Sequence, residues 1–160
     1  MSDRVFIDKQ TPSVFKALTA TATEIRSRAR EIGLDIILLE LVNVRASQLN
    51  ACTFCLDRHT HLALEAGETA QRLAVLPGWR DTDLFTSREQ AALELTEAVT
   101  LVAQQRPDDH TYARVRSTLN DDEVSLVTWA AITINAFNRV SLMSRHAVRP
   151  RGGTADGPQD

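Results

Sequence analysis

The residue pattern of this 160-residue chain is helical almost from end to end, and the residues that interrupt helices are concentrated at its C-terminal end. Of the six glycines and five prolines, three glycines and two prolines lie within residues 150–160. In the first long segment, residues 13–32, apolar side chains recur three or four positions apart, as they do on one face of a helix. No run of alternating apolar and polar residues is long enough to predict a strand. We therefore expect an all-α fold.

The predicted helices are bounded by residues that commonly cap helices. Gly33 fits the C-terminal end of the first helix, and Asp35 and Asn50 fit the N-terminal ends of the next two. Thr86, followed three residues later by Glu89, has the capping-box pattern. We expect helices over residues 13–32, 36–48, 50–67, 69–76 and 88–103, then one that begins near 107–109 and a long one from 120–123 to about 145.

We expect one domain, because a chain of this length can bury a sizeable core and shows no internal repeat. The unusually apolar segment IILLELVNVRASQ is expected at the centre of that core. The predicted organisation is an N-terminal arm (residues 1–12), a helical domain (residues 13–147) and a disordered C-terminal tail (residues 148–160).

Net charge and hydropathy limit the classes of binding partner and the cellular location that we expect. A net charge of −3, a pI near 5.8 and the lack of a basic cluster argue against nucleic-acid binding and against a membrane surface. The first ten residues lack the apolar core of a signal peptide, and the longest apolar stretch is far short of the ~20 residues that span a bilayer. We therefore expect a cytoplasmic protein, in which a close cysteine pair is typical of a metal-binding or catalytic site.

Both cysteines and two of the four histidines lie in one short segment, LNACTFCLDRHTHLALEAGE. On a helix, Cys52, Cys55 and His59 share one face because they are three and four residues apart, whereas His61 points elsewhere. If the helix begins just before the first cysteine, its partial positive charge favours a thiolate. A pKa of ~8.5 leaves about 3% of a thiol ionised at pH 7, whereas a pKa of ~7 ionises roughly half.

The spacing of the two thiols suits a redox cycle. One thiolate attacks an electrophile such as a peroxide oxygen and becomes a sulfenic acid, and the second thiol condenses with it to a disulfide. A Cys-X-X-Cys spacing keeps this second step intramolecular.

Glu40 interrupts the apolar segment that precedes the cysteines and has Leu39 and Leu41 beside it. A buried glutamate is rare, and burial raises the pKa of a carboxyl towards neutrality, which suits a general acid or base. The alternative is that Glu40 points to solvent or pairs with an arginine such as Arg45. Periodicity alone leaves both interpretations open.

Glu40, Cys52, Cys55 and His59 together fit the pattern E-x11-C-x2-C-x3-H, and on these residues the chain resembles the AhpD-like alkylhydroperoxidases of the carboxymuconolactone decarboxylase superfamily. The resemblance extends over residues 40–140 and implies a helical subunit that assembles into homotrimers or homohexamers. It also implies that Cys55 attacks the hydroperoxide and Cys52 resolves the intermediate. Glu40 and His59 would form the proton relay. A helix dipole alone favours Cys52 as the attacking thiol, so the residues by themselves leave the order open.

The chain departs from this family at Phe54, where the best-known members have a histidine before the second cysteine. Phe54 removes one group of the proton relay, so the sequence leaves open the efficiency of peroxide reduction and the identity of the reductant. In the founding members a lipoyl-bearing partner returns electrons to the disulfide. Here we expect a dithiol reductant, either lipoyl-bearing or thioredoxin-like, and neither a metal nor a bound organic cofactor.

Other functions use the same residues differently. A zinc site would take Cys52, Cys55 and His59, with His61 or a carboxylate as fourth ligand, but one helical face converges poorly on one ion. A helical binding or scaffold module would leave the thiols unused. Lactone decarboxylation, for which the superfamily is named, has no use for two neighbouring thiols.

The remaining polar and aromatic residues are interpreted as mostly structural. We expect surface positions for His110 and His146, and either a solvent-exposed position or a subunit contact for His61. Asn135 and Asn138, on a long apolar helix, are expected to hydrogen-bond a neighbouring backbone or subunit. Phe54 and Phe85 are candidates for lining the approach to the thiols.

The sequence therefore predicts an all-α, homo-oligomeric thiol peroxidase that reduces organic hydroperoxides or hydrogen peroxide through a Cys52–Cys55 disulfide cycle. Trimer and hexamer stay open, as do the natural substrate and the electron donor.

Overall fold

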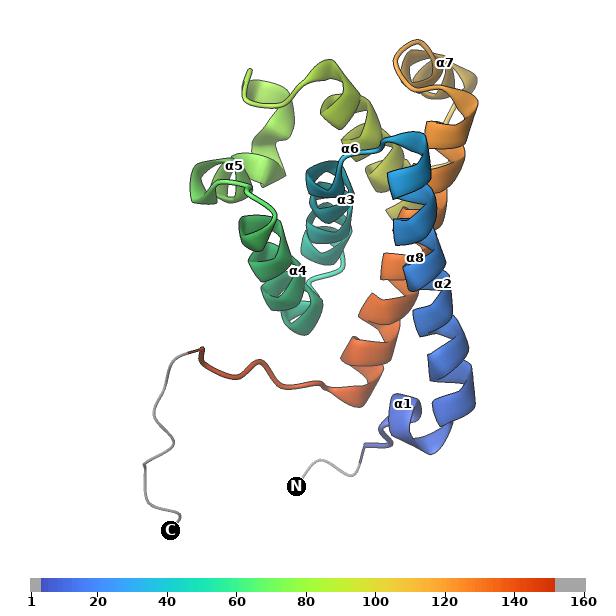
Figure 1. Cartoon of the computed structure of the whole chain (residues 1–160), viewed down its shortest axis with the longest axis vertical. Coiled ribbons are helices and arrows are strands. Elements are labelled where there is room, and N and C mark those ends of the chain that lie inside the picture. The colour runs from blue at the N-terminus through green and yellow to red at the C-terminus, as the bar shows by residue number, and fades with distance from the viewer. Residues whose placement is uncertain (1–3, 152–160) are drawn as a thin grey trace.

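Helices account for all the regular secondary structure of residues 4–151, the part of the chain that the computed structural model describes, and the predicted all-α fold is confirmed (Figure 1). Within this range no helix is both long enough and apolar enough to cross a membrane. The elements in chain order are α1 (Ile7–Gln10), α2 (Pro12–Ile32), α3 (Ile36–Leu49), α4 (Thr53–Glu65), α5 (Ala70–Val75), the 3-10 helix η1 (Leu76–Asp81), α6 (Ser87–Thr100), α7 (Asp109–Arg116) and α8 (Asp121–Ser144).

Most helix ends lie where the sequence predicts them, because the local capping residues act as expected. Gly33 ends α2 in the left-handed region, at φ 70°. The Asp35 side chain then accepts a hydrogen bond from the Ile37 amide (2.9 Å) and begins α3. α6 and α8 each begin with a complete capping box.

α3 is the central helix of the fold. It packs against α2, α4, α6 and α8, and eight of its fourteen residues are buried. In Figure 1, α4 lies on one side of α3 and α2 lies on the other. A helix without a polar face needs neighbours on several sides, and each Leu or Val that it buries contributes about 1.5–3 kcal/mol. This arrangement places Glu40 deep inside the protein.

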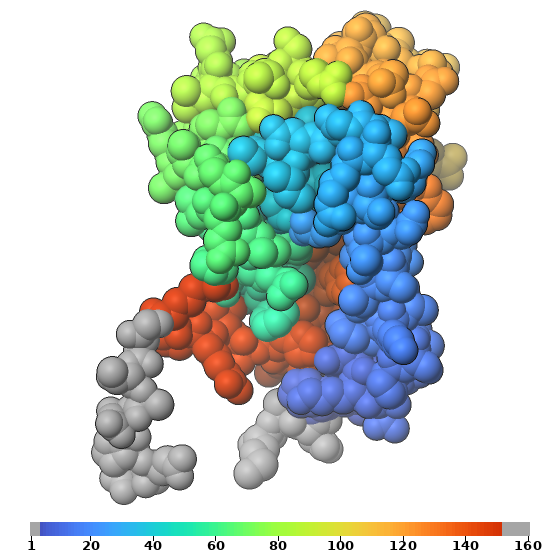
Figure 2. Space-filling view, viewed as in Figure 1, coloured from blue at the N-terminus to red at the C-terminus, as the bar shows by residue number. Residues whose placement is uncertain are grey.

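The apolar core lies on two faces of α3. One cluster joins α3 to α2, α6, α7 and α8, and the other joins it to α4, α5, η1 and α6. A third, small cluster contains both cysteines and lies where the start of α4 meets α8. In the space-filling view, the start of α4 (teal) meets the end of α8 and the residues that follow it (red) (Figure 2). The thiols therefore lie at a junction of three helices.

The turn between α3 and α4 differs from the predicted one. Ala51 adopts the left-handed region at φ 51°, and Cys52, rather than Asn50, is the N-cap residue of α4. The Asn50 side chain cannot cap α4 because its amide donates to two asparagines of α8 (2.9 and 2.8 Å). Cys52 consequently lies just before the helix, and only Cys55 lies within its first turn.

Both ends of the described chain pack against the helices. The short α1, within the predicted arm, contacts α2 and α8, and the Ile7 amide donates to Ser144 Oγ (3.2 Å). After α8, Arg151 pairs with Asp57 (2.6 Å). The domain boundaries and the homo-oligomer stay predictions, and the predicted disorder of the tail falls mainly on residues 152–160, outside the described range.

Candidate functional site

Cys52 and Cys55 lie in one buried cluster at the N-terminal end of α4, and no disulfide joins them. They are 1% and 4% exposed, so their sulfurs are shielded from bulk water. Two cysteines three residues apart at the start of a helix can form a disulfide once one of the sulfurs carries a leaving oxygen.

The two thiols differ in acidity. The hydrogen bond from the Cys52 thiol lowers the pKa of Cys55 to about 6, against the opposing effect of burial. The side chains of Ser141 and Asn138 and the charge of His59 add to this shift. The pKa of Cys52 is raised, first because its hydrogen is held in the bond to Cys55 and then because it is buried. At pH 7 a thiol with a pKa of 6 is roughly nine-tenths ionised, so the acidity favours Cys55 as the nucleophile.

A cavity of about 480 Å³ opens beside Cys55, between α2, α3, α4 and α8. Its volume is within the range of sites for small organic molecules. Phe54 lines the cavity, as predicted, together with Phe15 and Phe137. Of the two cysteines, Cys55 lines the cavity and Cys52 does not. An apolar molecule in this cavity therefore meets the more acidic of the two sulfurs.

Glu40 and His59 form a hydrogen-bonded pair beside the thiols. Glu40 is fully buried, and its Oε2 lies 2.8 Å from His59 Nδ1. When Glu40 is ionised, Nδ1–H donates to the carboxylate and leaves Nε2 as the nitrogen that can accept a proton. His59 lies one helical turn after Cys55 and its charge favours the Cys55 thiolate.

Arg26 of α2 is the cationic partner of Glu40, with which it forms an ion pair, whereas the predicted candidate, Arg45, pairs instead with Glu97 (2.8 Å). Burial by itself would raise the pKa of Glu40, but hydrogen bonds and charge from His59 and Arg26 outweigh it, and the pKa lies below its ordinary value. The predicted shift towards neutrality is therefore wrong, because it counted desolvation without these partners.

Polar side chains tie the turn after α3 to the middle of α8. Asn50 Nδ2 donates to Asn135 Oδ1 (2.9 Å) and to Asn138 Oδ1 (2.8 Å). Asn138, which is fully buried, donates to Ser47 Oγ (3.1 Å). Asn135 Nδ2 also donates to the Ala131 carbonyl (2.8 Å), a backbone partner of the kind that the sequence predicts, and to Thr100 Oγ1 of α6 (2.9 Å). We call this set of side chains the asparagine seam: Ser47, Asn50, Asn135 and Asn138.

His146 belongs to the site, although the sequence predicts a surface position for it. Its side chain is 15% exposed and lines the cavity together with Cys55. Arg145 ends α8 in the left-handed region at φ 52°, and this turn directs the chain back onto the helix. His146 Nδ1 then lies 3.3 Å from Ser141 Oγ, and Nε2 lies 3.2 Å from Asp8 Oδ1. Helical periodicity gives no signal here, because the residue follows the last turn.

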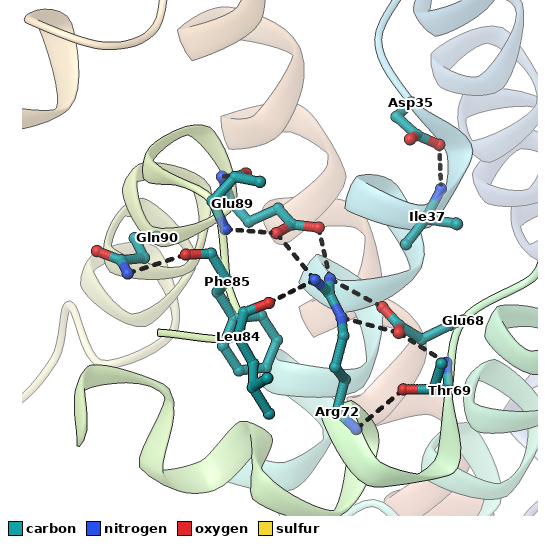
Figure 3. A network of polar contacts seen from close by, with 10 residues as sticks. Asp35, Ile37, Glu68, Thr69, Arg72, Leu84, Phe85, Glu89 and Gln90 are labelled. Atoms are coloured by element: carbon teal, nitrogen blue, oxygen red, sulfur yellow. Dashed lines mark hydrogen bonds and ion pairs between the residues drawn. The ribbon is translucent and has the colours of Figure 1, made fainter. Parts of the chain in front are cut away.

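Phe85, the other predicted lining residue, lies away from the cavity. It is 3% exposed in the cluster around η1, and the Arg72 guanidinium lies 4.7 Å from its ring centre. Figure 3 shows Arg72 between the carboxylates of Glu68 and Glu89, to which it is paired at 2.9 and 2.5 Å. The prediction for Phe85 is therefore wrong, because the residue is part of a network that joins α5 to the start of α6.

The other two histidines lie at the surface, as predicted. His61 pairs with Glu65 (3.1 Å), and the exposed His110 contacts Arg114. Over the described range, no three or more His, Cys, Asp or Glu side chains are grouped so that they could hold a metal ion. The alternative zinc site would also compete with Glu40 for His59.

The chain is similar to one protein family and to proteins of three bacteria. Residues 12–98 match the carboxymuconolactone decarboxylase family. The uncharacterised protein YdfG of Bacillus subtilis (strain 168) is 33% identical over 142 residues, which cover 89% of this chain and 94% of that protein. The uncharacterised protein YnjA of Escherichia coli (strain K12) is 32% identical over 68 residues, 42% of this chain and 37% of that protein. The crystal structure of an Agrobacterium tumefaciens protein of unknown function, suggested to be an antioxidant defence protein AhpD, has a TM-score of 0.82 and 30% identity over 91% of this chain and 99% of that chain.

The acidity difference predicts a single thiolate that forms at mildly acidic pH. In a titration of the reduced protein followed by thiolate absorbance at 240 nm, one sulfur should ionise with a midpoint near pH 6. Cys52→Ala should raise that midpoint because the hydrogen-bond donor is lost, whereas Cys55→Ser should abolish the acidic transition. Two thiols that both titrate above about pH 8, as unperturbed cysteines do, would contradict this assignment.

Proposed function

Because this chain belongs to the carboxymuconolactone decarboxylase family and has the AhpD-like helical fold, we propose that it is a peroxidase that reduces organic hydroperoxides through a Cys52–Cys55 dithiol–disulfide cycle. The observation that carries the proposal is the pair of neighbouring thiols with opposite pKa shifts, of which the acidic one lines a largely apolar cavity.

In the first step, the Cys55 thiolate attacks the terminal oxygen of the hydroperoxide. A sulfur–oxygen bond forms, the oxygen–oxygen bond breaks, and its electron pair leaves on the alkoxide, which takes a proton to become the alcohol. Sulfur is oxidised to the sulfenic acid and the peroxide is reduced. The low pKa of Cys55 supplies the thiolate at neutral pH, and the cavity brings the oxidant to it.

In the second step, Cys52 displaces the oxygen from the Cys55 sulfenic acid. The Cys52 thiol loses its proton, the sulfur–sulfur bond forms, and the oxygen leaves as water. Because the two cysteines lie three residues apart in one buried cluster, the second sulfur is close to the sulfenic acid when it forms. The higher pKa of Cys52 suits this role, because the thiol stays protonated while its neighbour attacks.

The Glu40–His59 pair supports the thiolate rather than acting as two equal proton carriers. The lowered pKa of Glu40 keeps it ionised at neutral pH, so it serves to orient the imidazole and to stabilise its charge. His59 then exchanges the proton of Cys55 through Nε2. Arg26 balances the second carboxylate oxygen and fixes Glu40 from α2.

The electron donor that we propose is a flexible dithiol, such as the lipoyl arm of a partner protein. Both sulfurs are at most 4% exposed, so a reductant must reach the disulfide through the cavity. A long, slender dithiol can do so more easily than a cysteine on the face of a thioredoxin-like protein.

The exposed Trp129 and Ile132 of α8 support the proposed homo-oligomer, because they leave apolar surface for a second copy to cover.

The redox cycle predicts a specific chemical change. Metal-free, reduced protein treated with one equivalent of cumene hydroperoxide should lose two hydrogens, and peptide mapping should locate a Cys52–Cys55 disulfide that dihydrolipoamide reduces. Unlinked thiols after this treatment would contradict the peroxidase and favour a binding or scaffold module. Thiols that become protected only when zinc is added would instead identify a Cys/His zinc site.

The cavity predicts a preference for bulky organic hydroperoxides. Ala22 of α2 lines the cavity, and Ala22→Trp should lower kcat/KM for cumene hydroperoxide about tenfold while leaving hydrogen peroxide nearly unchanged. Ala20→Trp is the matched control, because Ala20 is exposed on the same helix and does not line the cavity. An equal effect on both oxidants, or no effect on either, would show that substrates do not use this cavity.

A further inference from the structure

A row of hydrogen-bonded polar side chains from α1, from α8 and from the residue after its C-cap reaches Cys55. This row is separate from the Glu40–His59 pair. Ser141 Oγ lies 3.6 Å from Cys55 Sγ, and His146 Nδ1 lies 3.3 Å from Ser141 Oγ. Asp8 Oδ1 completes the chain at 3.2 Å from His146 Nε2. The three side chains come from the last turns of α8, from the residue after its C-cap and from α1.

The His146 ring is held in one orientation by contacts on several sides. It stacks on Phe6 at 6.0 Å between ring centres and meets Phe54 edge-on at 5.1 Å. Its backbone amide donates to the Ser141 carbonyl (3.1 Å). Asp8 is itself positioned by the α1 segment, which is tied to the end of α8 through the Ile7 amide. The N-terminal segment thus contributes a carboxylate to the site.

These three side chains face the cavity in which the hydroperoxide would react with Cys55. Ser141, His146 and Asp8 all line the same cavity as Cys55. Ser141 is 7% exposed, and the side chains of His146 and Asp8 are each 15% exposed. A carboxylate, an imidazole and a hydroxyl in sequence, ending at a nucleophilic sulfur, form an arrangement that can move a proton to a bound substrate.

We propose that Asp8, His146 and Ser141 deliver the proton that the departing alkoxide needs when Cys55 attacks a hydroperoxide, an inference that rests on the proposed peroxidase function. As the oxygen–oxygen bond breaks, the Ser141 hydroxyl gives its proton to the leaving oxygen and takes one from His146 Nδ1. The Asp8 carboxylate faces His146 Nε2–H and stabilises the imidazolium until the transfer. Ser141 touches the reacting sulfur, whereas His146 and Asp8 act through it as positioning residues.

The protons consumed and released balance over one turnover. Formation of the Cys52–Cys55 disulfide releases water and consumes no net proton. Reduction of that disulfide by a dithiol returns Cys52 to the thiol and Cys55 to the thiolate, and it releases one proton, which restores the His146 imidazolium. The His59 imidazole meanwhile keeps its role at the thiolate, so the two imidazoles serve different parts of the reaction.

The leaving group of the oxidant gives a direct test. Cumene hydroperoxide expels an alkoxide that needs a proton, whereas 3-chloroperoxybenzoic acid expels a stable carboxylate that does not. In single-turnover oxidation of the full-length protein, His146→Gln and Ser141→Ala should each slow the reaction with cumene hydroperoxide by about 10- to 100-fold, towards the low end of general-acid effects. The rate with the peroxyacid should change less than about threefold, and the ratio of the two rates is the readout.

Conservative variants separate proton delivery from a structural role. Ser141→Thr keeps a hydroxyl and should restore the wild-type ratio, and the surface control His61→Gln should leave both rates unchanged. An equal loss with both oxidants, or no loss in either variant, would overturn the inference while the wild-type disulfide cycle stands. Wild-type protein that forms no Cys52–Cys55 disulfide with cumene hydroperoxide would instead remove the proposed function itself.

Discussion

A difference in acidity between two buried sulfurs is the constraint on which the candidate site depends. Where water is largely excluded, two neighbouring thiolates repel each other, so the ionisation of one sulfur holds the proton on the other. Cys52, at the N-cap of α4, keeps its proton and donates a hydrogen bond to Cys55. Cys55 lies within the first helical turn and lines the cavity. Under the proposed function, these positions make Cys55 the nucleophile and Cys52 the resolving thiol.

The asparagine seam places the sulfurs in these positions. The buried face of α8 carries Asn135 and Asn138 towards the turn that contains Asn50. A buried amide that lost its partner would cost about 1–3 kcal/mol, so the seam fixes the relation of α3, the cysteine turn and α8. The same helix then carries Ser141 and, after its end, His146. α8 and the residues just after it thus help to position the thiol pair and also supply it with polar neighbours.

The sequence predicts the features that depend on neighbours along the chain. Helix ends follow from local caps, and the motif from Glu40 to His59 follows from spacing. The contacts that it misses join distant residues: Arg26 meets Glu40 across 14 positions, and His146 meets Asp8 across 138. Asn50 has the propensity of a cap, but its tertiary hydrogen bonds prevail. The His146 ring meets Phe54 edge-on, and no local pattern in the sequence indicates this contact.

The claim on which this account depends is that Cys55 attacks and Cys52 resolves. The most direct measurement is to trap the sulfenic acid with dimedone in the Cys52→Ser and Cys55→Ser variants after one equivalent of cumene hydroperoxide, with mass spectrometry to locate the adduct. The account predicts a rapid adduct on Cys55 in the Cys52→Ser protein and almost none on Cys52 in the other variant. An adduct that forms on Cys52 at an equal or greater rate, or in neither protein, would contradict it.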